Sequence, residues 1–137
     1  MAMFQERVAG KLDAVEAVTA EDALHGRVRA LIGEFNGLFG KFMAELIAEG
    51  QGDPAILREL YDEHIAGRRA STAAEVERGK AEGEFSPDTD AVLLIDAIFG
   101  PIYFRLLLRF APLTEQYGDA LVDQVLRGAR ATAAEGR

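Results

Sequence analysis

Few residues in this 137-residue chain could support catalysis. The sequence has no cysteine, which excludes disulfides, thiolate metal sites and cysteine nucleophiles. Its two histidines, His25 and His64, fall on different predicted helices, and neither belongs to a motif that pairs histidine and glutamate at metal-binding spacing. Gly33, Gly37 and Gly40 lie within a helical pattern, whereas a phosphate-binding loop would lie between a strand and a helix. We therefore predict a protein that is not an enzyme and that uses no metal and no cofactor.

Four polar residues lie on or beside the core-facing line of one predicted helix: Tyr61, His64, Arg68 and Thr72. Buried polar groups must form hydrogen bonds, so these side chains need partners either within the protein or in a ligand. In the first alternative, Arg68 pairs with a carboxylate such as Asp96, and His64 is half exposed at the helix edge. In the second alternative, at least two of the four side chains face a bound ligand.

The elements that position these residues are predicted to be helical. Hydrophobic residues recur at steps of three and four, which predicts an all-α fold, an antiparallel bundle of about five helices without a convincing strand. Thr19 followed by Asp22, and Asp53 followed by Pro54, are typical helix starts. We expect a single domain over residues 1–130, followed by a frayed tail at residues 131–137. The expected helices are about residues 3–18, 19–49, 54–82, 88–110 and 114–130.

The second of these helices carries small residues on the face opposite its large hydrophobic ones. Each internal glycine costs a helix roughly 1 kcal/mol relative to alanine, so a run of them needs a reason. Either a neighbouring helix approaches this face closely, or a cavity borders it, or small residues are simply common in a chain with 14 glycines. The small residues are Gly26, Ala30, Gly33, Gly37, Gly40, Ala44 and Ala48.

Residues 86–111 form the most apolar stretch of the chain and are hydrophobic on nearly every side. A helix without a solvated face must be covered from two directions. A membrane span is disfavoured because charged residues such as Asp96 and Arg105 interrupt the stretch and Gly100-Pro101 should bend it. We therefore expect a buried helix that is covered partly by its own domain and partly by a second copy of the chain.

The overall charge limits the possible partners. The formal net charge is −8 and the pI is about 4.8, so the chain would repel a phosphate backbone and should not bind DNA by itself. A mean hydropathy of zero, with 49% hydrophobic residues, suits a soluble globular protein. The N-terminus lacks the apolar core of a signal peptide, so we expect a cytoplasmic protein with no membrane partner.

Three motifs follow one another in the later part of the chain. They are the pair Arg68-Arg69, the break Gly83-Glu84-Phe85 followed by Pro87-Asp88 and Asp90, and the run Gly100-Pro101-Ile102-Tyr103-Phe104-Arg105-Leu106-Leu107. In this order they resemble the C-terminal regulatory domain of the tetracycline-repressor family of transcriptional regulators. The resemblance covers about residues 20–130, and the predicted helix before it fits the end of the linker helix that joins the family's two domains.

The resemblance implies a homodimer in which residues 88–110 and 114–130 form a four-helix bundle with their partners. It also implies a mostly apolar cavity in each subunit that binds a small effector and shifts the spacing of two DNA-reading heads. The family's N-terminal helix-turn-helix is missing from these residues, so DNA contact is expected only through that missing domain. Either the sequence is a regulatory domain from a longer repressor, which the uncapped first helix favours, or a natural protein has lost its reading head.

The candidate site residues follow from the helix faces and from this resemblance. The residues expected to meet at a ligand site are Phe35, Phe39, Phe42, Tyr61, His64, Ile65, Arg68, Phe99 and Tyr103. The residues expected at the dimer interface are Leu106, Leu107, Phe110, Tyr117, Leu121, Val125 and Leu126. In the alternative interpretation, the aromatic cluster is packed core and the chain is a dimeric helical interaction module without an effector.

Overall fold

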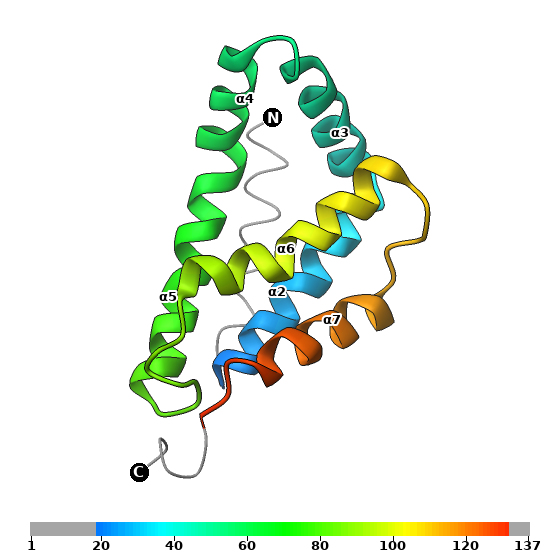
Figure 1. Cartoon of the computed structure of the whole chain (residues 1–137). Helices are drawn as coiled ribbons and strands as arrows, with labels where there is room; N and C mark the ends of the chain where they lie inside the picture. Colours follow the sequence, from blue (N-terminus) through cyan, green and yellow to red (C-terminus); the bar gives the residue numbers. More distant parts are fainter. Residues whose placement is uncertain (1–18, 132–137) are drawn as a thin grey trace.

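The computed structural model describes residues 19–131 and contains helices in the order that the sequence predicts (Figure 1). Within this range no strand occurs, and an isolated bridge joins Phe85 to Arg130. The all-α prediction is therefore confirmed, while the helix predicted over residues 3–18 and most of the predicted tail lie outside the described residues. The elements are α2 (Ala20–Phe35), α3 (Leu38–Gly50), α4 (Pro54–Leu60), the π-helix η1 (Tyr61–Ile65), α5 (Ala66–Ala81), α6 (Ala91–Leu108) and α7 (Glu115–Arg127).

Side-chain caps begin four of these helices. Thr19 and Asp53 each accept a hydrogen bond from a backbone N–H of the first turn, at 3.0 and 3.1 Å, as the sequence predicts. Asp90 and Thr114 do the same for α6 and α7. The Glu84 carboxylate, from the loop after α5, also accepts hydrogen bonds from the first two N–H groups of α2, at 2.9 and 2.8 Å. These contacts satisfy backbone groups that have no partner within a helix.

The prediction of one continuous helix over residues 19–49 is wrong, because the chain breaks at Asn36 between α2 and α3. Asn36 Nδ2 donates a hydrogen bond to the carbonyl oxygen of Leu113 at 2.9 Å, which fixes this break to the loop before α7. Gly40 packs directly on the end of α2, since a Cβ atom built at Gly40 would lie 1.9 Å from the Phe35 carbonyl oxygen. The small residues of the two helices therefore do not form one continuous face.

The helix predicted over residues 54–82 is continuous but contains the π-helical turn η1 between α4 and α5. A π-turn closes a wider ring than an α-turn and so rotates the faces that follow it. Tyr61, predicted on the core-facing line, is the first residue of η1 and is 44% exposed. His64, predicted at the helix edge, is buried with 5% exposed. The core-facing line accordingly runs from Leu60 through His64 to Thr72.

Helix α2 lies at the centre of the described bundle, between α5 and α7, and α6 crosses over it (Figure 1). Its buried hydrophobic residues are Ala20, Ala23, Leu24, Val28, Leu31, Ile32 and Phe35. Helix α7 can approach α2 closely because Gly118 faces it, and a Cβ atom at Gly118 would lie 2.7 Å from the Ile32 side chain. The core of residues 19–131 is thus organised around α2.

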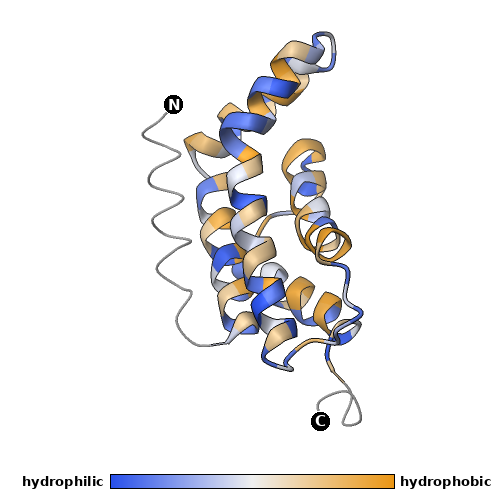
Figure 2. Ribbon diagram, turned by 90° about the vertical axis from the view of Figure 1, so that its left-hand side faces the viewer, coloured by the Kyte–Doolittle hydropathy of each residue, from blue (hydrophilic) through white to orange (hydrophobic). Residues whose placement is uncertain are grey.

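Residues 19–131 bury one face of helix α6 and leave the opposite face exposed. Its inner face is buried and carries Leu94, Ile95, Ile98 and Ile102. Its opposite side, which we call the outer face of α6, consists of the exposed residues Val92, Leu93, Phe104, Leu107 and Leu108. The residues of α6 are hydrophobic over most of its length, and Figure 2 colours the bundle by hydropathy. Among the described helices, α6 is the one that is long and apolar enough to cross a membrane, and 22% of it is buried.

Candidate functional site

Aromatic side chains from α2, α3, η1 and α6 form one cluster, as the sequence predicts. The ring centroids of Phe35 and Tyr103 lie 5.2 Å apart in an edge-to-face arrangement, and those of Phe35 and Phe39 lie 5.9 Å apart. The His64 ring lies 5.3 Å from Phe42 and 6.3 Å from Phe39. These spacings are those of closely packed aromatic pairs. Five of the nine predicted ligand residues therefore meet, and they fill the space between them.

A small cavity of about 50 Å³ lies beside this cluster, between α2, η1–α5 and α6. Its apolar walls are Leu31, Ile65, Phe99 and Tyr103. Its polar walls are Arg27, Arg68, Arg69 and Thr72. Sites for drug-sized ligands usually measure about 300–1,000 Å³, so in this state the cavity has room for a few atoms. Of the predicted ligand residues, Tyr61 lies outside this region on the surface.

Arg68 joins the aromatic cluster to the cavity. Its Cζ atom lies 5.1 Å from the centroid of the Phe39 ring, which is a cation–π contact. Burial lowers the pKa of Arg68, and the Tyr103 hydroxyl partly offsets this effect. Within the described part of the chain, Arg68 Nη2 is buried without a hydrogen-bond partner. The predicted pairing of Arg68 with Asp96 is wrong, because Arg69 Nη1 donates to Asp96 Oδ1 at 2.7 Å instead.

Arg27 of α2 is a second cation at the cavity, and it is not among the site residues predicted from the sequence. The residue is 2% exposed, and its Nε atom has no hydrogen-bond partner among residues 19–131. The spacing could have revealed it, because Arg27 follows Leu24 by three positions and precedes Leu31 by four on the core-facing line of α2. A buried charge without a counter-charge is costly, so Arg27 requires an explanation.

His64 is the buried histidine of the cluster. In the described structure its Nδ1 atom has no hydrogen-bond partner, and its Nε2 atom lies 3.8 Å from Glu63 Oε2, beyond hydrogen-bond distance. Burial lowers the pKa of His64 because the charged ring loses its solvation, and Arg68 adds to this effect while Glu63 opposes it. The ring is therefore mostly neutral near pH 7.

We expect the free energy of unfolding to decrease as the pH falls below about 6.5, the pKa of histidine in an unfolded chain. The unfolded state then binds a proton that the folded state does not bind at His64, until the pH reaches the lowered pKa of the folded ring. In His64→Phe this part of the pH dependence should disappear. Denaturant titrations of both proteins between about pH 5 and 8 measure it, and equal slopes of stability against pH would contradict the assignment.

A larger hollow is the open groove of about 1180 Å³ between α3 and the segment that joins α6 to α7. Small residues line its α3 side, namely Gly37, Gly40, Ala44 and Ala48. Arg105 and Phe110 lie on the opposite side, where the Arg105 guanidinium stands 3.6 Å from the centroid of the Tyr117 ring. The part of the small-residue set that lies on α3 thus borders a hollow, which is one of the alternatives drawn from the sequence.

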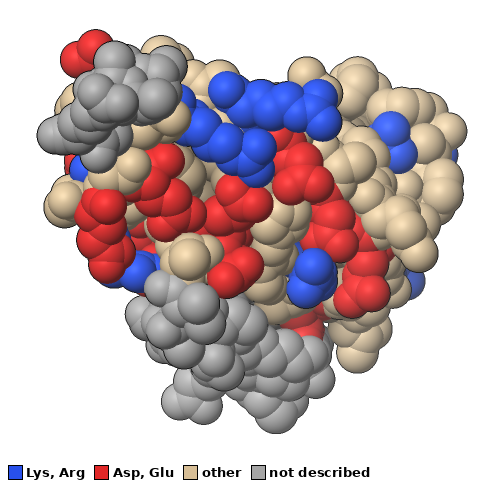
Figure 3. All heavy atoms as spheres, turned by 90° about the horizontal axis from the view of Figure 1, so that it is seen from below, with Lys and Arg blue, Asp and Glu red and all other residues tan. Residues whose placement is uncertain are grey.

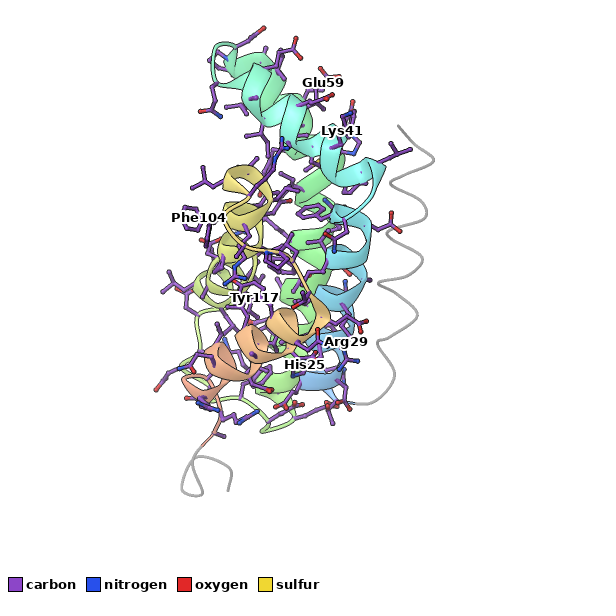
Figure 4. All side chains as sticks on the ribbon, turned by 90° about the vertical axis from the view of Figure 1, so that its right-hand side faces the viewer. His25, Arg29, Lys41, Glu59, Phe104 and Tyr117 are labelled. Atoms are coloured by element: carbon purple, nitrogen blue, oxygen red, sulfur yellow. The ribbon has the colours of Figure 1, made fainter. Side chains whose placement is uncertain are left out.

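The predicted dimer residues divide between the surface and the core. Leu107 and Phe110 are exposed. Leu106, Tyr117, Leu121 and Val125 are half-buried against the core. Leu126 is fully buried in the core of its own chain and is not accessible to a partner. The rest of the outer face of α6 was not predicted as interface from the sequence. Figure 4 shows one of its residues, Phe104, projecting from this helix away from the bundle.

Charged side chains join α7 to α2 at the His25 and Arg29 positions (Figure 4). His25 Nδ1 lies 3.0 Å from Asp119 Oδ1 and His25 Nε2 lies 2.9 Å from Asp123 Oδ1, and only a doubly protonated ring can donate to both. Arg29 Nε donates to Asp119 at 3.0 Å. Burial opposes ionisation of Asp119, but the hydrogen bonds from Arg29 and His25 prevail and lower its pKa. The network fastens α7 to α2.

The same end of the molecule brings Glu21, His25 and Asp123 within metal-ligand distance of one another. Glu21 already accepts a hydrogen bond from Arg130 at 2.8 Å, and both nitrogens of His25 face carboxylates. Figure 3, which views this end from below, shows acidic and basic side chains intermixed. We therefore interpret the group as part of an ion-pair network.

Comparisons with known proteins agree with this architecture. Residues 18–125 match the family model described as tetracyclin repressor-like, C-terminal domain. Over 95 residues the chain is 33% identical to the uncharacterized HTH-type transcriptional regulator YdeS of Bacillus subtilis (strain 168), a match that covers 69% of this chain and 48% of that protein. The chain thus spans about half the length of this curated relative. The crystal structure of the TetR family transcription regulator SCO0332 matches with a TM-score of 0.80 and 25% identity, covering 91% of this chain and 71% of that one.

Proposed function

The chain belongs to the tetracycline repressor-like C-terminal domain family, and we propose that it is the effector-binding and homodimerisation domain of a transcriptional regulator. In this proposal the cavity between α2, η1–α5 and α6 binds a small, mostly apolar or aromatic molecule. The observation that carries the proposal is the composition of the cavity, in which apolar walls surround the buried Arg27 and the half-buried Arg68. Small-molecule sites typically combine apolar walls with a few placed polar groups.

Helix α6 links the two activities of the proposed domain. One side of it supplies Phe99 and Tyr103 to the cavity, while its outer face carries Phe104 and Leu107. Because the cavity measures about 50 Å³, a ligand must displace side chains or shift α6 in order to enter. A shift of α6 also moves the outer face, so ligand binding changes the arrangement of the two subunits.

The outer face of α6 supports the dimer half of the proposal. Contiguous exposed hydrophobic residues mark an interaction surface rather than ordinary solvent-facing protein. A second copy of the chain is a better cover than a membrane, because the exposed Asp96 lies on the same helix and forms an ion pair with Arg69. In a symmetric dimer the two outer faces pack against each other.

In this proposal a separate helix-turn-helix domain, outside the residues described, binds DNA. The net charge of −8 disfavours contact with a phosphate backbone. The relative YdeS, which is named an HTH-type transcriptional regulator, is about twice as long as the matched part. A regulator of this kind acts where the DNA is, so we place the protein in the cytoplasm.

Two measurements on the purified chain test the proposal. Light scattering should give a mass of twice 14.9 kDa, the mass of one chain. A thermal-melting screen with small apolar and aromatic molecules should find compounds that raise the melting temperature, whereas duplex DNA should not raise it. A monomeric mass would contradict the dimer half, and a broad library without a stabilising compound would contradict the effector half.

A further inference from the structure

We propose that the ligand of the cavity carries a carboxylate, which Arg27 and Arg68 bind together. The inference rests on the proposed effector site and names its ligand class. It starts from two guanidinium groups, those of Arg27 and Arg68, which line the same cavity. Each has a buried nitrogen, Arg27 Nε and Arg68 Nη2, that has no hydrogen-bond acceptor in the described structure. An apolar ligand would leave both groups unsatisfied, because it offers no acceptor.

The chain's own carboxylates do not fill this role within the described range. None of the residues that line the cavity is acidic. Asp96, on the neighbouring helix, is engaged by Arg69 at 2.7 Å, and the buried Glu75 is engaged by Arg78 at 2.7 Å. Two cations that share a cavity without an acidic wall repel each other, and an anion placed between them removes both the repulsion and the unpaired donors.

The surroundings favour a carboxylate on an apolar body. A guanidinium group presents a planar fork of N–H donors that matches the two oxygens of a carboxylate. Arg68 is held in place by its contact with the Phe39 ring, 5.1 Å from Cζ to the ring centroid. Leu31, Ile65 and Phe99 supply the apolar wall.

The size of the cavity also sets the direction of the ligand. A volume of about 50 Å³ admits a carboxylate group, while the rest of the molecule must point toward the rim. The rim lies at Arg69, whose side chain is 27% exposed and forms an ion pair with the exposed Asp96. Entry of the body of the ligand therefore takes place between α5 and α6, and this ion pair borders the opening.

Matched pairs of small molecules test the inference on the unmodified protein. Benzoate and hexanoate are compared with benzamide and hexanamide at equal concentration and equal ionic strength. We expect the carboxylates to raise the melting temperature by about 5 to 10 °C when they are in hundredfold excess over Kd, and the amides to have little effect. Inorganic phosphate should not stabilise the protein, because it has no apolar body to contact the cavity wall.

Variants of the two arginines test whether the carboxylates bind in this cavity. In Arg27→Met and Arg68→Met the carboxylates should bind at least about tenfold more weakly, because each variant removes a charge-assisted contact. Ligand-free Arg27→Met should melt at the same or a higher temperature, because the substitution removes a costly buried charge. Arg58→Met, which removes an exposed arginine of α4, is the control for net charge and should retain carboxylate binding.

The outcomes separate this inference from the proposed function. If amides and carboxylates stabilise the protein equally, and the arginine variants respond as the unmodified protein does, the effector site stands and the carboxylate inference is wrong. If neither class binds, the carboxylate inference is wrong, and the thermal-melting screen with the broad library decides separately whether the effector site exists. If the carboxylates bind, the Arg27 Nε–H resonance in a ¹H–¹⁵N spectrum should shift on titration, and an unshifted resonance would place them elsewhere and overturn the inference.

Discussion

The variant Phe104→Glu is expected to be monomeric at about 10 μM, a concentration at which the unmodified chain is expected to be a dimer. Phe104 is 55% exposed on the outer face of α6 and packs its ring against Phe110, so its own chain does not require it for the core. In a symmetric dimer each substitution occurs twice and places two carboxylates in the interface. Burying each charge costs several kcal/mol, so the dissociation constant should rise by at least about a thousandfold.

Light scattering over a concentration series measures this change. The matched control is Phe104→Leu, which keeps an apolar side chain at the same position and should remain dimeric. Circular dichroism should show the same helix content for both variants, because neither substitution touches the buried face of α6. A dimeric mass for the folded glutamate variant would show that the outer face of α6 is not the interface.

The order of the helices could be predicted from the sequence because two local signals agree. The three-and-four spacing of hydrophobic residues identifies the buried faces, and the capping residues identify the starts at Thr19 and Asp53. Both signals depend on residues within one turn of each other. They do not depend on which helix packs against which.

The two wrong helix predictions have a common cause. The spacing of hydrophobic residues alone does not show where a helix breaks or where its faces rotate. Asn36-Gly37 is a turn dipeptide, but the hydrophobic pattern continues on both sides of it and therefore predicts one continuous helix. Leu60, His64, Arg68 and Thr72 are spaced by four each time, which exceeds the 3.6 residues of an α-helical turn. The π-turn η1 accommodates this wider repeat, with Tyr61 exposed at its first residue and His64 buried within it.

The aromatic residues of the candidate site could be predicted from the sequence, but its charged residues could be predicted only in part. Phe35, Phe39 and Tyr103 lie on core-facing positions, so their meeting follows from the helix faces. Arg27 lies on a core-facing position too, but arginine is rarely buried, so its residue type gives no signal that it belongs to the core. Which arginine would pair with Asp96 depended on the rotation of α5 after η1, and that rotation is a tertiary outcome.

The break between α2 and α3 makes Gly40→Ala the substitution with the largest expected effect on stability. The added methyl group would lie 1.9 Å from the carbonyl oxygen and 2.6 Å from the carbonyl carbon of Phe35. These are backbone atoms at the end of α2, so they cannot move aside as a flexible side chain would. The two helices must separate, which disturbs the Phe35 ring and its contact with Tyr103. We expect a loss of about 2 to 4 kcal/mol in the free energy of unfolding.

Gly33→Ala is the matched control for this prediction, because it makes the same chemical change seven residues earlier. A Cβ atom at Gly33 meets nothing within 4 Å, so the methyl group fits without a shift. Alanine favours the helix over glycine, so this variant should gain about 0.5 to 1 kcal/mol. Urea denaturation of both variants at one protein concentration measures the two effects. Equal stabilities for the two variants would show that α2 and α3 do not meet at Gly40, and that one continuous helix, as the sequence alone suggests, is the better description.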